Sequence, residues 1–169
     1  MKKFVLVVFA SLVCAVSVSA QNYMVVDSKK IFESLDEYTQ ALKTIDELGV
    51  SYQSQVDAKF DEVEALYNSY MQRANSLNSV ERSVYETKIT NMEAEATEYQ
   101  ESIFAHDGVL IKKRLELLSP IQNRVFKAIE TYAKSRSYDL VLDESTSTTV
   151  LYKSSGVDHT AGVIEELKK

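Results

Sequence analysis

Residues 85–117 contain an apolar repeat that leaves the chain few ways to fold. The repeat alternates steps of four and three residues, and it runs through Tyr85, Ile89, Met92, Ala96, Tyr99, Ile103, His106, Leu110, Lys113 and Leu117. A stripe this narrow is typical of a coiled-coil seam, and not of the broader helix face that lies on a globular core. The sequence therefore predicts a long helix that pairs with another helix along its length.

The preceding segment supplies the partner helix. Apolar side chains recur every three or four residues between Tyr38 and Leu77, which is helical spacing. The polar stretch at residues 75–79 separates the two halves, and Asn78 followed by Glu81 resembles a capping box at the start of a new helix. We therefore expect a long antiparallel coiled-coil helical hairpin over residues 38–117, with its tip near 75–79.

Two glycines fall at one level of this expected hairpin. A turn at residues 77–78 places Gly49 near His106 and Gly108 near Glu47. Each glycine costs about 1 kcal/mol relative to alanine in a helix interior, so each needs a reason. Close approach of the helices is one explanation, and a hinge at Gly49 and Gly108 that lets the arms splay is the other.

The residues outside the hairpin, 21–37 and 118–169, predict a small α+β body. Short strands are expected at 23–27, 138–143 and 149–153. A body of this size is marginal as a single hydrophobic core, and its strands leave unpaired edges. Strands from several chains closing one barrel-like sheet would remove both problems. We therefore expect oligomerisation through the apolar strand residues Val25, Val26, Leu140, Val141, Leu142, Val150 and Leu151.

Two helices complete this expected body. Ser119 followed by Pro120 reads as an N-cap and a first-turn proline, which predicts a new helix beginning at Pro120. Asp158 reads as the cap of a last helix, with Ile164 and Leu167 pointing inward. The predicted fold class is therefore α+β and mainly α, with the hairpin projecting from the oligomerisation body.

Residues 1–20 have the features of a secretory signal, with two lysines, an apolar run and small residues before an expected cleavage after Ala20. Lipidation at Cys14 is disfavoured by the bulky Val13 before it. Without residues 1–20 the chain has no cysteine, which excludes disulfides and thiolate metal sites. No other segment approaches the roughly 20 apolar residues of a membrane span, so we expect no stable membrane insertion.

Charge and motif content exclude several classes of function. The expected mature chain has 17 basic and 25 acidic residues, a balance that disfavours nucleic acid as a partner. The only histidines, His106 and His159, are isolated from each other, whereas metal sites usually need three or four ligands. No nucleophile or phosphate-loop motif is present, so we expect neither an enzyme nor a cofactor or metal.

Three stretches outside the hairpin add a family resemblance. They are YMVVDSKKIFESLDEY near the start, SPIQNRVFKAIETYAKSRSYDLVLDES in the last third, and TVLYKSSGVDHTAGVIEELKK at the end. Together with the coiled coil between them, they resemble the Skp/OmpH family of periplasmic chaperones. The resemblance implies a homotrimer in which a small β-barrel body holds three hairpin tentacles. Unfolded outer-membrane proteins would be held between the tentacles in the periplasm, without ATP.

The hairpin departs from the enterobacterial members of this family, which are basic. Residues 38–117 contain 14 acidic and 8 basic residues, so lipid binding is not implied for this chain. Aromatic and methionine side chains make adaptable contacts. The candidate client-binding residues are therefore Tyr67, Tyr70, Met71, Tyr85, Met92 and Phe104.

Each of these candidates also has a structural interpretation. The tyrosines could fill the seam, and Phe104 could pack against the body as part of a second apolar stripe with Ile111, Leu115 and Leu118. A structural or adaptor coiled-coil protein of the cell envelope is the alternative function. Such a protein would leave little apolar surface exposed once its seams have paired.

Overall fold

The computed structural model describes residues 22–146 and 150–169. The expected signal at residues 1–20 and Thr149 of the expected third strand lie outside the described residues. The chain divides into two compact units. We call residues 35–123 the helical unit, and the described residues up to Ser34 together with Arg124–Lys169 the mixed unit.

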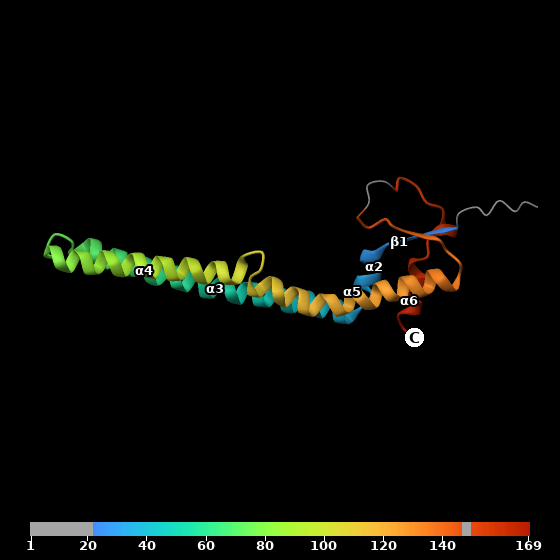
Figure 1. The fold of residues 1–169 in the computed structure, drawn as a ribbon, viewed down its shortest axis with the longest axis horizontal. Helices are drawn as coiled ribbons and strands as arrows, with labels where there is room; N and C mark the ends of the chain where they lie inside the picture. Colours follow the sequence, from blue (N-terminus) through green and yellow to red (C-terminus); the bar gives the residue numbers. More distant parts are fainter. Residues whose placement is uncertain (1–21, 147–149) are drawn as a thin grey trace, which may run out of the picture. The chain divides into compact units, whose positions relative to one another are not determined.

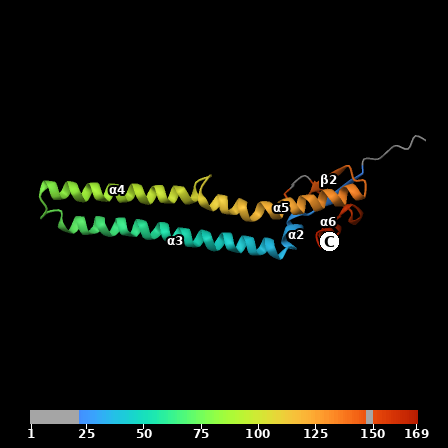
Figure 2. The same cartoon turned by 60° about the horizontal axis from the view of Figure 1, so that its bottom comes forward.

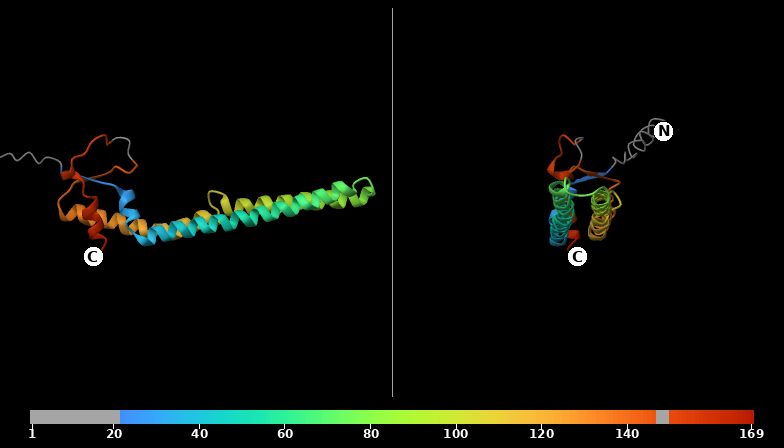
Figure 3. Two further views of the ribbon diagram at one scale, coloured as in Figure 1. Left: turned by 180° about the vertical axis from the view of Figure 1, so that it is seen from behind. Right: turned by 90° about the vertical axis from the view of Figure 1, so that its left-hand side faces the viewer.

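The helical unit contains α3 (Asp36–Arg73), α4 (Ser79–Phe104) and the first part of α5 (Val109–Ser135). Helices α3 and α4 lie side by side and run in opposite directions (Figures 1 and 2). Seen end-on, they form two separate columns (Figure 3, right). The long helices confirm the mainly helical character expected from the sequence.

The turn between α3 and α4 is set by a local sequence signal, the capping box at Asn78 and Glu81. The Asn78 side chain accepts a hydrogen bond from the Glu81 backbone N–H at 3.0 Å, and the Glu81 carboxylate accepts one from the Asn78 N–H at 2.9 Å. These two bonds satisfy backbone donors that a helix start leaves open. The expected capping box is therefore present, and it fixes where α4 begins.

The seam is buried where the sequence repeat is strictest. Ile89, Ala96 and Ile103 recur every seven residues along α4, and each is at most 7% exposed. The buried side chains of α3 are Ala41, Ile45, Val56 and Val63. Side chains at this spacing lie on one helix face, which explains why the two helices pair.

The expected continuous helix through residues 104–109 is wrong. Helix α4 ends at Phe104 and α5 begins at Val109, and the residues between them loop out to the side (Figures 1 and 2). His106 therefore does not lie on the seam, and its side chain is 95% exposed. Phe104 and Ile111 also lie on different helices, so the expected second apolar stripe is interrupted.

Because of this loop, the two glycines do not lie where the sequence predicted. Gly108 is not inside a helix, and a Cβ atom there would lie 2.4 Å from the Ile103 carbonyl oxygen. Only a residue without a side chain fits that approach. Gly49 is inside α3, and the nearest side-chain atom to its Cβ position is Leu110 Cδ2, at 3.9 Å, instead of an atom of His106.

The mixed unit is built on β1 (Tyr23–Val26) and β2 (Leu140–Asp143), which form a two-stranded parallel sheet. Tyr23 pairs with Leu140 and Val26 with Asp143. The short helix α2 (Ser28–Glu33) follows β1, and η2 (Ser155–Val157) precedes α6 (Thr160–Glu166). The core of this unit consists of fully buried side chains, among them Met24, Val26, Ile31, Val125 and Val163.

Three expectations for residues 118–169 are wrong. Residues Val150–Lys153 form no strand, and the described part of the chain contains the two paired strands β1 and β2 only. Pro120 lies inside α5, where it removes one backbone hydrogen bond while buried Leu118 and Ile121 keep the helix continuous. Asp158 is one residue before the N-cap position of α6, although its carboxylate does accept from the Thr160 N–H.

Candidate functional site

Four large apolar side chains are exposed where α3 and α4 meet their connecting turn. Tyr67 is 48% exposed and Met71 is 53% exposed on α3, and Val80 and Val84 on α4 are 71% and 63% exposed. We call these four residues the tip patch. Several large apolar side chains left exposed near one turn are typical of an interaction site, whereas a paired coiled coil should bury its large apolar groups.

Two of the candidate tyrosines have a structural role beside this patch. The rings of Tyr70 and Tyr85 are stacked at 5.8 Å between centroids, with 25° between their planes. The Tyr70 hydroxyl donates to Glu86 Oε1 at 2.7 Å, and this hydrogen bond raises the pKa of Tyr70. Tyr70 and Tyr85 therefore join α3 to α4, while Tyr67 and Met71 remain open to a partner.

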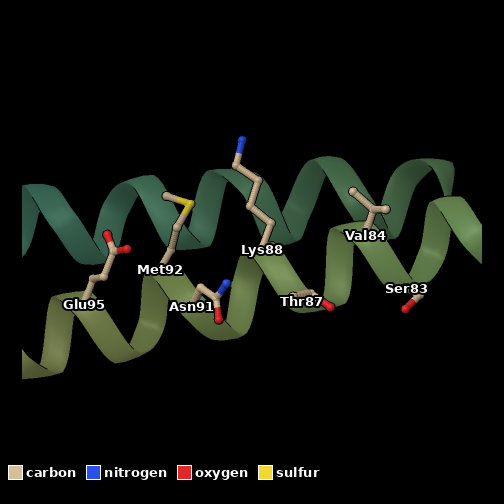
Figure 4. A pocket seen from close by; sticks show the side chains of 7 residues that line it. All are labelled: Ser83, Val84, Thr87, Lys88, Asn91, Met92 and Glu95. Atoms are coloured by element: carbon tan, nitrogen blue, oxygen red, sulfur yellow. The ribbon is translucent and has the colours of Figure 1, made fainter.

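An open groove of about 460 Å³ runs along α4 next to the tip patch. Figure 4 shows Val84, Lys88 and Met92 along one side of the helix, one turn apart. Ser83, Thr87 and Asn91 lie on the adjacent side. Val84 belongs to both the groove and the tip patch. Met92 is half-buried there, and Phe104 is half-buried at the end of α4.

The sequence interpretation missed Val80 and Val84. Both lie off the seam, whereas the candidate client contacts are all aromatic or methionine side chains. Two valines four residues apart on a coiled-coil flank are nevertheless a signal, because flank positions normally hold polar side chains. An apolar pair with helical spacing outside the seam could have identified this surface.

Charge distinguishes the tip from the rest of the α3–α4 pair. Residues 66–88 have three basic and two acidic side chains, a net charge of +1. Residues 38–65 and 89–104, which we call the shaft, have two basic and ten acidic side chains, a net charge of −8. Within the described residues, no salt bridge involves Arg73, Arg82 or Lys88.

The shaft has a smaller apolar surface of its own. Leu42 and Val50 of α3, with polar neighbours that include Asp46 and Glu47, line an open groove of about 640 Å³. Val50 is 73% exposed. The cations of the shaft are already engaged, because Lys43 pairs with Glu47 and Lys59 lies over the Tyr99 ring. The exposed apolar groups here are therefore surrounded by uncompensated negative charge.

A second apolar surface lies on the mixed unit. Leu140 and Leu142 of β2 are 52% and 37% exposed, and Leu151 and Tyr152 are 93% and 86% exposed. Leu142, Leu151 and Tyr152 also line a groove of about 370 Å³ with Tyr23 and Val150. Such large side chains are seldom this exposed in a chain that functions alone.

The candidate oligomerisation residues divide between the core and this surface. Val25 and Val26 are 2% and 1% exposed and pack inside the chain itself. Leu140, Leu142 and Leu151 are open, and Val141 and Val150 are half-buried. A partner chain could therefore reach the side chains of Leu140, Leu142 and Leu151 directly, but not those of Val25 and Val26.

The segment that presents Leu151 is held at both ends. Lys153 Nζ lies 2.5 Å from Glu144 Oε1 and 2.7 Å from Asp158 Oδ2. The hydrogen bond from Lys153 is the main cause that lowers the pKa of Asp158 to about 2, and bonds from Thr160 act in the same direction against the effect of burial. Lys153 therefore ties Glu144, the first residue after β2, to Asp158.

The two histidines lie in different surroundings, His106 in the exposed loop after α4 and His159 among aromatic side chains. His159 lies between two tyrosines, with Nδ1 3.1 Å from the Tyr132 hydroxyl and Nε2 2.7 Å from the Tyr138 hydroxyl. The described residues contain no group of three or more potential ligands that could hold a metal ion. Nor does any helix in the described ranges have the length and apolar character needed to cross a membrane.

A long helical pair with an exposed apolar tip, together with a small unit that has an open apolar edge, defines a coiled-coil protein with surfaces for other polypeptides. The chain belongs to the Skp/OmpH-like family, because residues 22–167 match the family model described as "Outer membrane protein (OmpH-like)". Among curated proteins, no sequence matches this chain. Membership suggests a chaperone role for outer-membrane proteins, since members of the family are periplasmic chaperones and not enzymes.

Proposed function

We propose that this protein is an ATP-independent periplasmic holdase, which binds unfolded outer-membrane proteins and prevents their aggregation. The observation that supports this function best is the tip patch. Its four large side chains stay exposed although the α3–α4 seam is paired. A spacer or docking rod has no need of such a surface, which is why the holdase is favoured over the structural or adaptor protein.

The chemistry of the tip patch suits a changing set of unfolded clients. Methionine is flexible and polarizable, and tyrosine combines an apolar ring with a polar hydroxyl, so both adapt to different partners. Contacts of this type are individually weak and therefore reversible. A holdase that has no ATP to drive release needs that reversibility.

Assembly of the holdase as a homotrimer rests on the open surface of the mixed unit. The outer edge of β2 is unpaired within the described residues, and exposed apolar strand edges favour pairing with another chain. Leu151 and Tyr152 are almost fully exposed, and Lys153 beside them is held by Glu144. Three copies that share this surface would enclose a cavity between their helical pairs, in which a client is held.

The client-binding proposal is tested by removing the apolar character of the tip. In one variant, Tyr67, Met71, Val80 and Val84 are all replaced by serine. A urea-unfolded outer-membrane barrel protein is diluted into each chaperone, and aggregation is followed by light scattering. We expect the wild type to suppress aggregation and the tip variant to lose most of that effect. Thermal unfolding by circular dichroism should be nearly unchanged, because the replaced groups are exposed.

The matched control is Val50→Ser, which removes an equally exposed apolar group from the shaft. This control should suppress aggregation as the wild type does. A tip variant that also suppresses aggregation fully would disprove the role of the tip patch. A wild-type protein that leaves the client to aggregate at both low and moderate salt would favour the adaptor function.

The trimer is tested separately by multi-angle light scattering. The wild type should have a mass near three chains, and it should gain the mass of one client when capture occurs. Adding charge with Val141→Asp and Leu151→Asp should dissociate the assembly before the helices melt. A doubly substituted protein that keeps its native mass would show that this surface does not hold the copies together.

A further inference from the structure

The loop between α4 and α5 is a closed structure of four residues, Ala105 to Gly108. The Ala105 N–H donates to the Glu101 carbonyl at 2.9 Å and ends α4. The Gly108 N–H donates back to the Ala105 carbonyl at 2.8 Å, and the Lys112 N–H donates to the Gly108 carbonyl at 3.1 Å to begin α5. The chain thus leaves the helix axis and returns to it within one tight turn (Figure 2).

This loop changes the register between α3 and its partner helix. On the tip side of the loop, Gln55 pairs with Tyr99 through a hydrogen bond of 2.7 Å. Six residues farther from the tip on each helix, Gly49 should lie opposite residue 105. Instead its Cβ position is nearest to Leu110. The register has therefore moved by about the length of the loop.

The length of the loop makes a second register possible. A helix has 3.6 residues per turn, so taking up four residues adds about one turn and rotates the rest of the helix by only about 40°. The four–three repeat of the sequence runs through this segment without a break, from Ile103 through His106 to Leu110. A continuous helix would therefore keep the seam of α5 facing α3.

Helix α3 offers equivalent positions for both registers. Ile45, Gly49 and Tyr52 follow one another along its seam at intervals of one turn. In the structure Leu110 contacts Gly49, and after a slide of one turn it would face Ile45. Packed helix interfaces of this kind have discrete alternative arrangements, and one-turn steps are among the known ones.

We propose that residues 105–108 are a register switch in the helical unit. In the looped state, which is the structure described above, Leu110 lies at Gly49. In the continuous state, the four residues join α4 to α5 in one helix, and α5 slides along α3 by about 6 Å, which is four residues at 1.5 Å each. Helix α3 has no matching change of length, so the slide bends the pair of helices.

Two residues favour the looped state. Gly108 allows the close approach to the Ile103 carbonyl, which any side chain would block. His106 is 95% exposed in the loop, whereas the continuous helix would place this polar ring on the seam. The proposed switch replaces a simple hinge at Gly49 and Gly108, and it stands independently of the proposed holdase function.

Disulfide trapping tests the switch directly, because residues 21–169 contain no cysteine. The pair Leu42→Cys and Leu117→Cys reports the looped register, one heptad away from the Gly49–Leu110 contact. The pair Leu42→Cys and Lys113→Cys reports the continuous register. The control pair, Tyr52→Cys and Ile103→Cys, lies on the tip side of the loop and should close equally in both states. Intramolecular products are read at monomer mass on non-reducing gels.

We expect the 42–117 product to dominate in the wild-type background, with the 42–113 product as a minority. The changes Gly108→Ala and His106→Leu together should raise the 42–113 share at least about fivefold, because alanine gains about 1 kcal/mol over glycine in a helix and a factor of ten corresponds to 1.4 kcal/mol. Deleting residues 105–108 should abolish the 42–113 product and keep the 42–117 product.

The switch is overturned if the 42–113 product forms in neither background while the control pair closes. If the control disulfide does not form in the Gly108→Ala and His106→Leu background, the test rests on the wild-type background alone. There, a 42–113 product that disappears on deletion of the loop supports the switch, and its absence refutes the switch.

Discussion

Replacing Gly162 with alanine should destabilise the mixed unit, although this change usually stabilises a helix. A Cβ atom at Gly162 would lie 2.2 Å from the Tyr132 hydroxyl oxygen and 2.5 Å from two of its ring carbons. Tyr132 is 6% exposed, and its hydroxyl lies 3.1 Å from His159 Nδ1. The Arg136 guanidinium covers the ring at 3.7 Å from its centroid. The ring therefore cannot move away without losing these contacts.

The expected size of the effect follows from three contributions. Forcing an extra methyl group into a packed site costs about 1–3 kcal/mol. Losing the hydrogen bond between Tyr132 and His159 costs about 0.5–1.5 kcal/mol more. The higher helix propensity of alanine offsets up to about 1 kcal/mol, since Gly162 lies inside α6. The net loss in the free energy of unfolding should be about 0.5–3.5 kcal/mol.

Urea unfolding, followed by circular dichroism at a fixed protein concentration, measures this loss. Gly49→Ala is the matched control, because its Cβ position has no neighbour closer than 3.9 Å and the change should raise stability slightly. In a Tyr132→Leu background, Gly162→Ala should cost at least about 1 kcal/mol less, which a double-mutant cycle detects. A Gly162→Ala protein as stable as the wild type would refute the close approach of Tyr132.

Two further predictions concern the mixed unit and one concerns the turn between α3 and α4. Because the pKa of Asp158 is lowered to about 2, its stabilising contribution is complete above the ordinary aspartate pKa and is lost as the pH falls through about 2. The urea midpoint should therefore drop between about pH 4 and pH 2, and Asp158→Asn should flatten that part of the curve. Lys153→Met leaves Glu144 and Asp158 unpaired, so it should lower thermal stability more than Lys134→Met, whose salt bridge with Glu130 is exposed. Tyr70→Phe should change stability by less than about 1 kcal/mol, since its hydrogen bond to Glu86 is exposed, while Tyr70→Ala should cost more by removing the stacked ring.

The parts of the fold that depend on local sequence could be predicted. The seven-residue spacing of Ile89, Ala96 and Ile103 determines which face of α4 is buried, whatever the partner is. The capping box at Asn78 and Glu81 depends on residues three apart. For the same reason, the existence of β1 and β2 could be predicted from their apolar residues, to within one or two residues at each end.

The remaining features depend on contacts that no local pattern contains. The repeat through His106 predicts a continuous helix, and only the approach of Gly108 to the Ile103 carbonyl distinguishes the looped form. Ser119 and Pro120 look like a helix start, but buried side chains on both sides of them continue α5. The segment from Val150 to Lys153 has strand character, yet a strand needs a partner, and no described residue of this chain pairs with it.

The candidate site was predicted in part for similar reasons. Tyr67 and Met71 are candidates because aromatic and methionine side chains make adaptable contacts, and both are exposed. The same argument could not show that Tyr70 would stack on Tyr85 and so leave the surface. That choice depends on the register between α3 and α4, which the sequence fixes only to within about a turn.

The separation of charge along the α3–α4 pair leads to a last prediction about salt. The tip patch lies in a segment with a net charge of +1, and the shaft has a net charge of −8. An acidic client is attracted weakly at the tip and repelled along the shaft. Salt screens both effects beyond the Debye length, which is about 8 Å at physiological ionic strength, but it leaves apolar contacts intact. Capture of an acidic client should therefore hold or improve as salt rises from about 50 to 300 mM. A steep loss of capture over that range would mean that attraction between charges, and not the apolar tip, holds the client.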